Sequence, residues 1–104
     1  MDKREDIVKG IKRFKRSLSK ERKVERVIFF GSRAYGKPGK HSDVDIIIVS
    51  PVFRGIKSGR GKGLHKHWGM DYPVDFLCYT PEEFERLKNR VSLVREAVKR
   101  GIAI

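Results

Sequence analysis

The chain has 104 residues, the length of one domain, and its 25 Lys and Arg against 13 Asp and Glu give a formal net charge of +12. No stretch is long and apolar enough to suggest a membrane span or a signal peptide, and the single cysteine, Cys78, excludes an internal disulfide. We therefore expect one cytoplasmic domain over residues 1–104. Its basic surface favours polyanions, although a composition without glutamine and with 37% charged residues is also typical of heat adaptation.

The first half of the chain predicts a helix followed by two strands. Apolar residues recur at helical spacing over residues 3–19, where they are Ile7, Ile11, Phe14 and Leu18. Residues 27–30 are apolar but too few for a helix, so they predict the first core strand. Gly31 ends this strand, and Ser32 is suited to cap a short helix or turn. Residues 44–49 predict a second strand that is covered on both faces, because it is continuously apolar after its acidic start.

The second half predicts a short helix near residues 64–68, a third strand at 74–79 and one terminal helix. Thr80, Pro81 and Glu83 form a typical helix start, with an N-cap, a proline in the first turn and a glutamate at the third position. The buried face of this helix is predicted to carry Phe84, Leu87, Val91, Val94 and Val98. The order of elements predicts an α/β (α+β) fold, a small sheet with helices packed against it.

Two carboxylates open the second predicted strand. Residues two apart in a strand point to the same face, so Asp43 and Asp45 are expected to lie about 7 Å apart. Like charges at that distance raise each other's pKa unless a cation lies between them, and the pattern therefore predicts a metal site. Asp75 lies inside the apolar third strand and would complete the site if the two strands are neighbours. Asp71 is the competing third carboxylate, although its surroundings are typical of a turn.

Mg²⁺ is the cation that this pattern favours. It prefers oxygen ligands, and two such ions can stabilise the attacking and leaving oxygens of a phosphoryl displacement. Upstream, the Gly31-Ser32 turn offers backbone N–H groups and a hydroxyl for the phosphates of a nucleotide.

The motif Gly31-Ser32-Arg33-Ala34-x-Gly36, followed by Ser42-Asp43-x-Asp45 and by Asp75, resembles the minimal nucleotidyltransferases of the DNA polymerase beta superfamily. The resemblance runs from about residue 24 to residue 80. It implies a polymerase-beta-like core, a short mixed sheet flanked by helices with the acids at one edge. It also implies transfer of a nucleoside monophosphate from an NTP, ATP above all, to an acceptor hydroxyl, with pyrophosphate leaving.

The resemblance also implies roles for the motif residues. Gly31 and Ser32 would hold the nucleotide phosphates. Asp43 and Asp45 would bind two Mg²⁺ ions that bridge those phosphates. Asp75 would complete the metal site and help to lower the pKa of the acceptor, as a base or as a metal ligand.

Three positions are left open. Arg33 would contact phosphate or serve as an exposed structural arginine. Tyr35 stands where relatives often carry a second arginine, so electrostatic help from this position is in doubt. The glycine-rich basic segment 54–63 is a mobile lid near the triphosphate or a solvated loop.

Minimal members of the family typically pair with a helical HEPN-type protein encoded nearby, often as the antitoxin of a toxin–antitoxin module. The resemblance thus implies adenylylation of a tyrosine on a HEPN toxin, an RNase, which silences it. The alternative is a non-catalytic basic module that neutralises a partner or binds RNA. Aromatic residues are too sparse among the basic ones to favour nucleic acid. A homodimer or a hetero-complex is compatible with a domain of this size.

Overall fold

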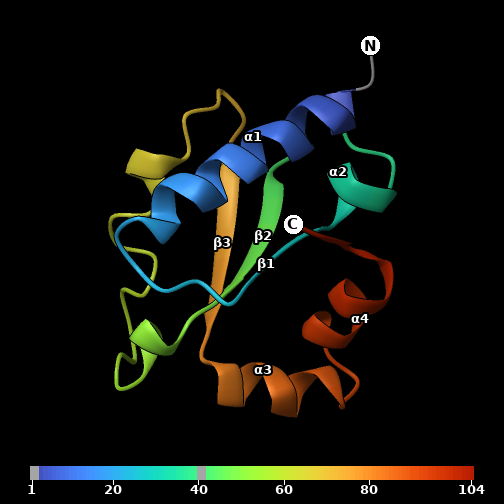
Figure 1. Ribbon diagram of the computed structural model, residues 1–104. Helices are drawn as coiled ribbons and strands as arrows, with labels where there is room; N and C mark the ends of the chain where they lie inside the picture. The colour runs from blue at the N-terminus through green and yellow to red at the C-terminus, as the bar shows by residue number, and fades with distance from the viewer. Residues whose placement is uncertain (1–2, 40–41) are drawn as a thin grey trace.

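The computed structural model describes residues 3–39 and 42–104 (Figure 1). Its helices are α1 (Lys3–Ser19), α2 (Ser32–Tyr35), α3 (Pro81–Lys88) and α4 (Leu93–Arg100), and its strands are β1 (Arg26–Phe30), β2 (Val44–Val49), β3 (Val74–Tyr79) and β4 (Ile102–Ala103). Two short 3-10 helices, Pro51–Phe53 and His65–His67, lie between β2 and β3. The predicted first helix, three strands and short helix near residues 64–68 are confirmed. Within the described residues, no helix is long and apolar enough to cross a membrane.

The four strands form one mixed sheet in the order β3-β2-β1-β4. β1 runs antiparallel to β2 and to β4, whereas β2 and β3 are parallel. A parallel pair needs a crossover of a dozen residues or more, and residues 50–73 supply it. The fold is therefore α+β, with a short mixed sheet flanked by helices, as expected.

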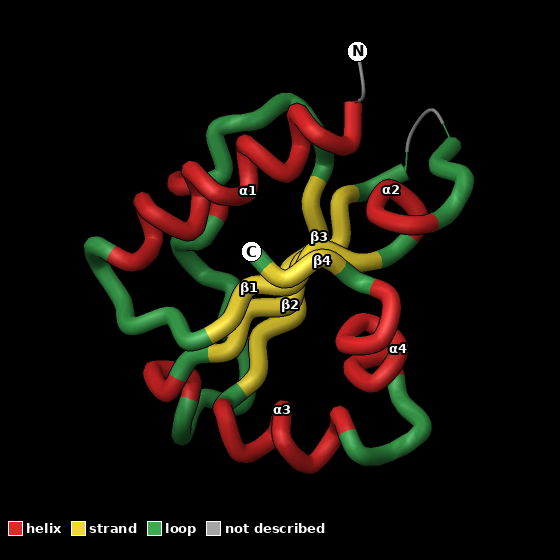
Figure 2. The backbone as a smooth tube through the Cα atoms, turned by 45° about the vertical axis from the view of Figure 1, so that its right-hand side comes forward, coloured by secondary structure: helices red, strands yellow, loops and turns green. Residues whose placement is uncertain are grey.

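Alternation of side chains along the strands builds one hydrophobic core on each face of the sheet. α1 covers the first face with the four apolar side chains that its spacing predicted, and these pack with Phe29 and Ile46. α3 and α4 cover the second face, where Phe84 packs with Ile28 and Ile47. Figure 2 shows the sheet between α1 on one side and α3 and α4 on the other. Burial on both faces explains why β2 is continuously apolar after its first two residues.

The prediction of a single terminal helix is wrong, because the structure has two helices separated by residues 89–92. Val91, expected on the buried face, lies in this break and is 93% exposed, and Val98 is 46% exposed. The break coincides with a new helix start, where the Ser92 side chain accepts a hydrogen bond from the Arg95 N–H. A serine N-cap satisfies an otherwise unpaired helix amide and so favours a start at that residue. The apolar spacing alone did not reveal it.

The edge strand β4 was not predicted. Gly101 ends α4, and the next two residues pair antiparallel with β1. The Ile104 N–H then donates to the Val27 carbonyl at 2.9 Å, and Lys15 Nζ donates to the Ile104 carbonyl at 2.7 Å. These contacts join the C-terminal residues to both β1 and α1.

Cys78 of β3 is half-buried, and burial raises the pKa of its thiol to about 11. At neutral pH the thiol is therefore protonated, and a protonated thiol is a poor nucleophile.

Candidate active site

The three acidic residues singled out in the sequence lie at one end of the β2–β3 pair. Asp45 stands directly opposite Asp75 in the parallel register, and neighbouring strands are about 4.8 Å apart. Asp43 lies two residues before Asp45, just outside β2. Asp71, the competing carboxylate, is exposed in the bend that precedes β3 and has no place in this register. The strand pairing on which the expected convergence depended is thus present.

Asp45 also lies against the glycine that ends β1. In the antiparallel register Asp45 is opposite Phe30, so the next residue, Gly31, comes close to its side chain. A Cβ atom added to Gly31 would overlap the Oδ2 atom of Asp45. Gly31 has φ +83°, a backbone conformation that L side chains rarely adopt. Glycine is therefore required at position 31 for two reasons: the positive φ of the backbone, and the close approach of the Asp45 carboxylate.

The electrostatic surroundings of Asp45 disfavour its charged form. Burial raises the pKa of this carboxyl first, and the neighbouring charges of Asp75 and then Asp43 raise it further. The electrostatic effect of both other acids on Asp45 shows that the three carboxylates lie close enough to interact.

The donor set fits a hard divalent cation. Among the described residues, no group of three or more His, Cys, Asp or Glu side chains is arranged so that it could hold a metal ion. Carboxylate oxygens are nevertheless the protein ligands that Mg²⁺ prefers, and a cation would relieve the repulsion that raises the pKa of Asp45. Asp43, Asp45 and Asp75 therefore supply the type of ligand that such an ion needs, in side-chain positions that are not arranged around one point in this structure.

The turn after Gly31 forms the one-turn helix α2. The N–H groups of Ala34 and Tyr35 donate to the Gly31 carbonyl at 3.0 and 3.1 Å, and the Gly36 N–H donates to the Ser32 carbonyl at 2.9 Å. No side chain caps the start of α2, and the first N–H groups of a helix have no partner within it. The half-buried Ser32 thus lies at the start of a turn that follows Gly31, the glycine that Asp45 approaches.

Arg33 has structural contacts. Its Nε donates to the Ser42 carbonyl at 2.7 Å, and its guanidinium carbon lies 5.1 Å from the centroid of the Tyr72 ring. The first contact joins α2 to the residue before Asp43, and the second joins α2 to the bend before β3. These contacts favour the structural interpretation of Arg33 over the phosphate contact.

The structure adds Arg100 to the surroundings of α2. Its guanidinium carbon lies 4.3 Å from the centroid of the Tyr35 ring, and it also pairs with Glu96 at 2.9 Å. An arginine from α4 thus stands over the tyrosine that occupies the position of the relatives' second arginine. No sequence signal could have found this contact, since the two residues are far apart in the chain and only the packing of α4 brings them together.

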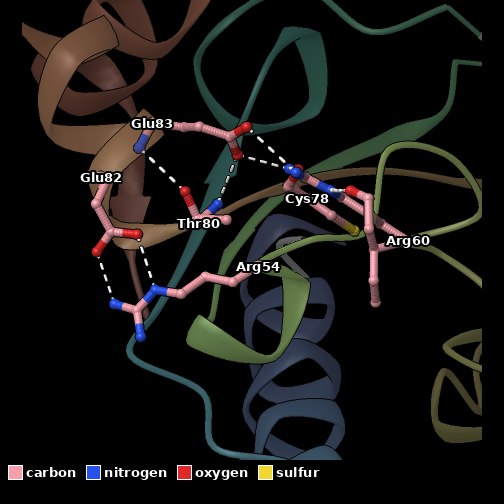
Figure 3. Close-up of polar contacts among 7 residues, drawn as sticks. Arg54, Arg60, Cys78, Thr80, Glu82 and Glu83 are labelled. Atoms are coloured by element: carbon pink, nitrogen blue, oxygen red, sulfur yellow. Dashed lines mark hydrogen bonds and ion pairs between the residues drawn. The ribbon is translucent and has the colours of Figure 1, made fainter.

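The basic segment 54–63 lies at the other end of β2 and β3. Figure 3 shows its anchors: Arg54 pairs with Glu82 through bonds of 2.9 and 2.6 Å, and Arg60 pairs with Glu83 through bonds of 2.6 and 3.2 Å. Both acids belong to the first turn of α3. The segment is thus attached at the end of the strands that is remote from the three carboxylates, and a lid over those carboxylates does not fit this placement.

A cavity of about 480 Å³ lies beside this segment and is lined in part by Arg22, Phe53 and Lys62. No acidic side chain lines it. The case for the carboxylate site therefore depends on strand register and charge, and the cavity is a separate feature of the surface.

A family model of the nucleotidyltransferase domain matches residues 11–104. The chain belongs to this family. The matched range includes every motif residue discussed above, and nucleotidyltransferase domains usually use divalent metal ions. The nucleotidyltransferase identity implied by the motif is thereby confirmed, and nucleotidyl transfer is the activity that it supports.

The fold is also similar to a crystal structure from Sulfolobus solfataricus, of a protein whose assignment as a nucleotidyltransferase is provisional. The TM-score is 0.66 with 21% sequence identity, over 96% of this chain and 80% of that one. At this identity the likeness concerns the fold. No curated protein matches the sequence of this nucleotidyltransferase domain.

Proposed function

We propose that this nucleotidyltransferase domain transfers the nucleoside monophosphate of ATP to a hydroxyl group, with Mg²⁺ held by Asp43, Asp45 and Asp75. The observation that carries the proposal is the position of Asp45, which faces Asp75 across two parallel strands and lies against Gly31. Three carboxylates that favour a cation thus lie beside a glycine turn suited to phosphate. The choice of ATP among the nucleotides is supported by the motif resemblance.

The reaction exchanges one bond to the α-phosphorus for another. The acceptor oxygen bonds to this phosphorus, the bond to the bridging oxygen of pyrophosphate breaks, and pyrophosphate leaves. Asp75 is exposed and accepts the hydroxyl proton, whereas a bound cation would hold the half-buried Asp45 in its charged form. Gly31 and Ser32 orient the phosphates through backbone N–H groups and the hydroxyl. A bound Mg²⁺ would neutralise phosphate charge and polarise the reacting oxygens.

For the acceptor, we propose a tyrosine of a HEPN-type toxin encoded nearby, so that this chain acts as its antitoxin in the cytoplasm. The support is the motif resemblance, which extends from the glycine turn to Asp75. Tyrosine offers a hydroxyl with a pKa near 10, which a cation beside it can lower toward neutral pH.

The direct test combines the chain, the HEPN-type protein from the adjacent gene, Mg²⁺ and ATP labelled at the α- or the γ-phosphate. We expect label from α-labelled ATP to appear on the HEPN protein and label from γ-labelled ATP to leave as pyrophosphate. The variant Asp43→Asn/Asp45→Asn should transfer at least about 100-fold more slowly. The control Glu5→Gln/Asp6→Asn removes two exposed acids from the first turn of α1 and should transfer normally.

Removal of the metal gives a second readout of the same assay. A chelator should stop transfer, and added Mg²⁺ should restore it, because the three carboxylates then regain their cation. Full neutralisation of the toxin by the double variant, with no transfer by either protein, would contradict the catalytic proposal and favour a stoichiometric binding module.

A further inference from the structure

The outward face of α1 carries an unusual concentration of positive charge. Residues 9–20 include six Lys and Arg and no Asp or Glu. Lys15, one of the six, donates to the Ile104 carbonyl. The other five are exposed and follow one another at spacings of one to four residues. Four lie along one side of α1 and the fifth lies in the turn directly after it; they are Lys9, Lys12, Arg13, Arg16 and Lys20, and we call them the cation stripe.

Among residues 3–39 and 42–104, no acidic side chain pairs with the cation stripe. In the part of the chain that the structure describes, none of its five side chains forms an ion pair, whereas Lys88 pairs with Glu85 in α3 and Arg100 pairs with Glu96 in α4. Several members of the stripe are four residues apart, and like charges at this spacing destabilise a helix. Heat adaptation arranges charges in ion-pair networks. An uncompensated line of cations is therefore not explained by heat adaptation and suggests an anionic ligand.

The composition of this face distinguishes among polyanions. The exposed large apolar side chains of the described residues all lie outside α1, and Phe14, the aromatic residue of α1, is fully buried. A protein interface is usually anchored by buried aromatic or apolar side chains, and single-stranded nucleic acid is usually bound by stacking on aromatic rings. The exposed face of α1 carries neither kind of anchor. Of the polyanions considered, a regular array of phosphate groups is therefore the class that fits this face.

The charge density of the cation stripe is similar to that of one strand of a DNA duplex. Lys20 lies eleven positions after Lys9, which corresponds to about 16 Å at the helical rise of 1.5 Å per residue. Five cations over that length give one per about 4 Å, and each strand of duplex DNA contributes one phosphate per about 3.4 Å of duplex axis. The face is also separate from the three carboxylates, because α1 covers one side of the sheet and Asp45 shares the opposite side with Ile47.

We propose that the cation stripe of α1 binds the phosphate backbone of duplex DNA without reading its base sequence. The five side chains neutralise phosphates and release counterions, so the affinity depends steeply on salt. Since the stripe and the carboxylates lie on opposite faces, this binding is independent of the proposed nucleotidyl transfer.

The test measures binding of a labelled 20-base-pair DNA duplex of arbitrary sequence by fluorescence anisotropy between 50 and 200 mM salt. Five phosphate contacts predict a slope of about −4.5 in log affinity against log salt, which is about a 500-fold loss over this range. In the stripe variant all five residues become Gln, a good helix former that keeps α1 intact. We expect the stripe variant to bind the duplex at least about tenfold more weakly at 50 mM salt. Its affinity should also depend much less steeply on salt.

The matched control replaces three lysines and two arginines outside α1 by Gln, so its net charge equals that of the stripe variant. Its sites are exposed and form no ion pair among the described residues; they are Lys57, Lys62, Arg86, Arg90 and Lys99. The affinity of the control variant for the duplex should stay within about threefold of that of the unmodified protein. Equal losses in the two variants would overturn the proposal, because net charge alone would then explain binding. Tighter binding of duplex RNA of the same length would overturn the assignment to DNA. Thermal unfolding of each variant verifies the fold.

Discussion

Asp45 is costly to the folded protein and central to its proposed chemistry. Burial and the charges of Asp75 and Asp43 raise the pKa of its carboxyl, so the folded state binds this proton more tightly than the unfolded state does. At neutral pH the ionised carboxylate therefore destabilises the fold, and this destabilisation fades as the pH falls through the raised pKa. A site that holds repelling carboxylates ready for a cation is expected to carry such a cost.

Asp45→Asn should consequently stabilise the fold while it abolishes transfer. Loss of the desolvated charge is expected to raise the free energy of unfolding at pH 7 by about 1 kcal/mol, or the melting midpoint by about 4–8 °C. Asp71→Asn is the matched control, because Asp71 is exposed and outside the strand register, and it should change neither quantity. Lower stability of Asp45→Asn in urea unfolding at pH 7 would contradict this account of the site.

Gly31 offers a second prediction for a single residue. Gly31→Ala forces an alanine to φ +83° and drives its Cβ into the Asp45 carboxylate, whereas Gly59→Ala meets a similar φ of +76° with open space around the new atom. The backbone strain common to both should cost about 1–3 kcal/mol. Only Gly31→Ala should also displace Asp45 and impair transfer. Equal transfer rates for the two variants, measured at matched folded fractions, would show that Asp45 tolerates the added methyl group.

At the scale of single elements, the start of α3 is the best-defined local feature. The Thr80 hydroxyl accepts the Glu83 N–H at 3.1 Å, and the Glu83 carboxylate accepts the Thr80 N–H at 2.8 Å (Figure 3). The same carboxylate binds Arg60, so one glutamate both caps the helix and anchors segment 54–63. The capping box was predicted from Thr80, Pro81 and Glu83, but the ion pair that completes it depends on how the segment folds back.

Glu83 makes the stability of this region depend on acid pH. The bond from Arg60, followed by the Thr80 backbone N–H, lowers the pKa of its carboxyl from the usual 4.5 to about 2. A lowered pKa contributes stability that is present above about pH 4.5 and is lost as the pH falls toward 2. Glu83→Gln should remove this part of the acid dependence in urea unfolding between pH 7 and pH 2.

Arg60→Gln provides the matching variant, because it removes the other member of the ion pair and with it the largest cause of the lowered Glu83 pKa. The double variant should lose less stability than the sum of the two single losses, because both single changes remove the same Arg60–Glu83 pair. Additive losses in the double-mutant cycle would mean that Arg60 and Glu83 stabilise the fold independently.

At the scale of the whole molecule, the C-terminal residues join the two layers of the fold. β4 extends the sheet beside β1, and Ile104 connects to Val27 of β1 and to Lys15 of α1. Ile102 and Ile104 are also packed against the core beneath α1. The last strand therefore links the sheet to the helix that carries the cation stripe.

Deletion of residues 102–104 should cost about 2–4 kcal/mol, from the lost pairing with β1 and the exposure of two isoleucines. Lys15→Met removes one hydrogen bond of this set and should cost about 1 kcal/mol. Because the three carboxylates lie on β2 and β3, the truncated protein should retain transfer below its melting midpoint. Chemical unfolding with circular dichroism separates the two losses, and a truncated protein as stable as the full chain would contradict the role given to β4.

The sequence by itself determined the local elements, since their signals depend on short-range physics. Helical spacing in residues 3–19, apolar runs in three strands and the Thr80 cap each act within a few residues, and each is present in the structure. The prediction of one terminal helix failed because two local signals competed there. Apolar spacing predicted a helix that continues through Val91, whereas the N-cap at Ser92 begins a second helix. The two-residue strand β4 was too short to carry a pattern.

Only the tertiary structure decided which of these elements meet. The parallel pairing of β2 with β3, and the register that sets Asp45 opposite Asp75, depend on a crossover of 24 residues, 50–73, that no local pattern specifies. The contact of Gly31 with Asp45 and that of Arg100 with Tyr35 arise in the same way, from the packing of distant segments. The acidic pattern predicted the kind of chemistry, and the strand register brought its carboxylates together.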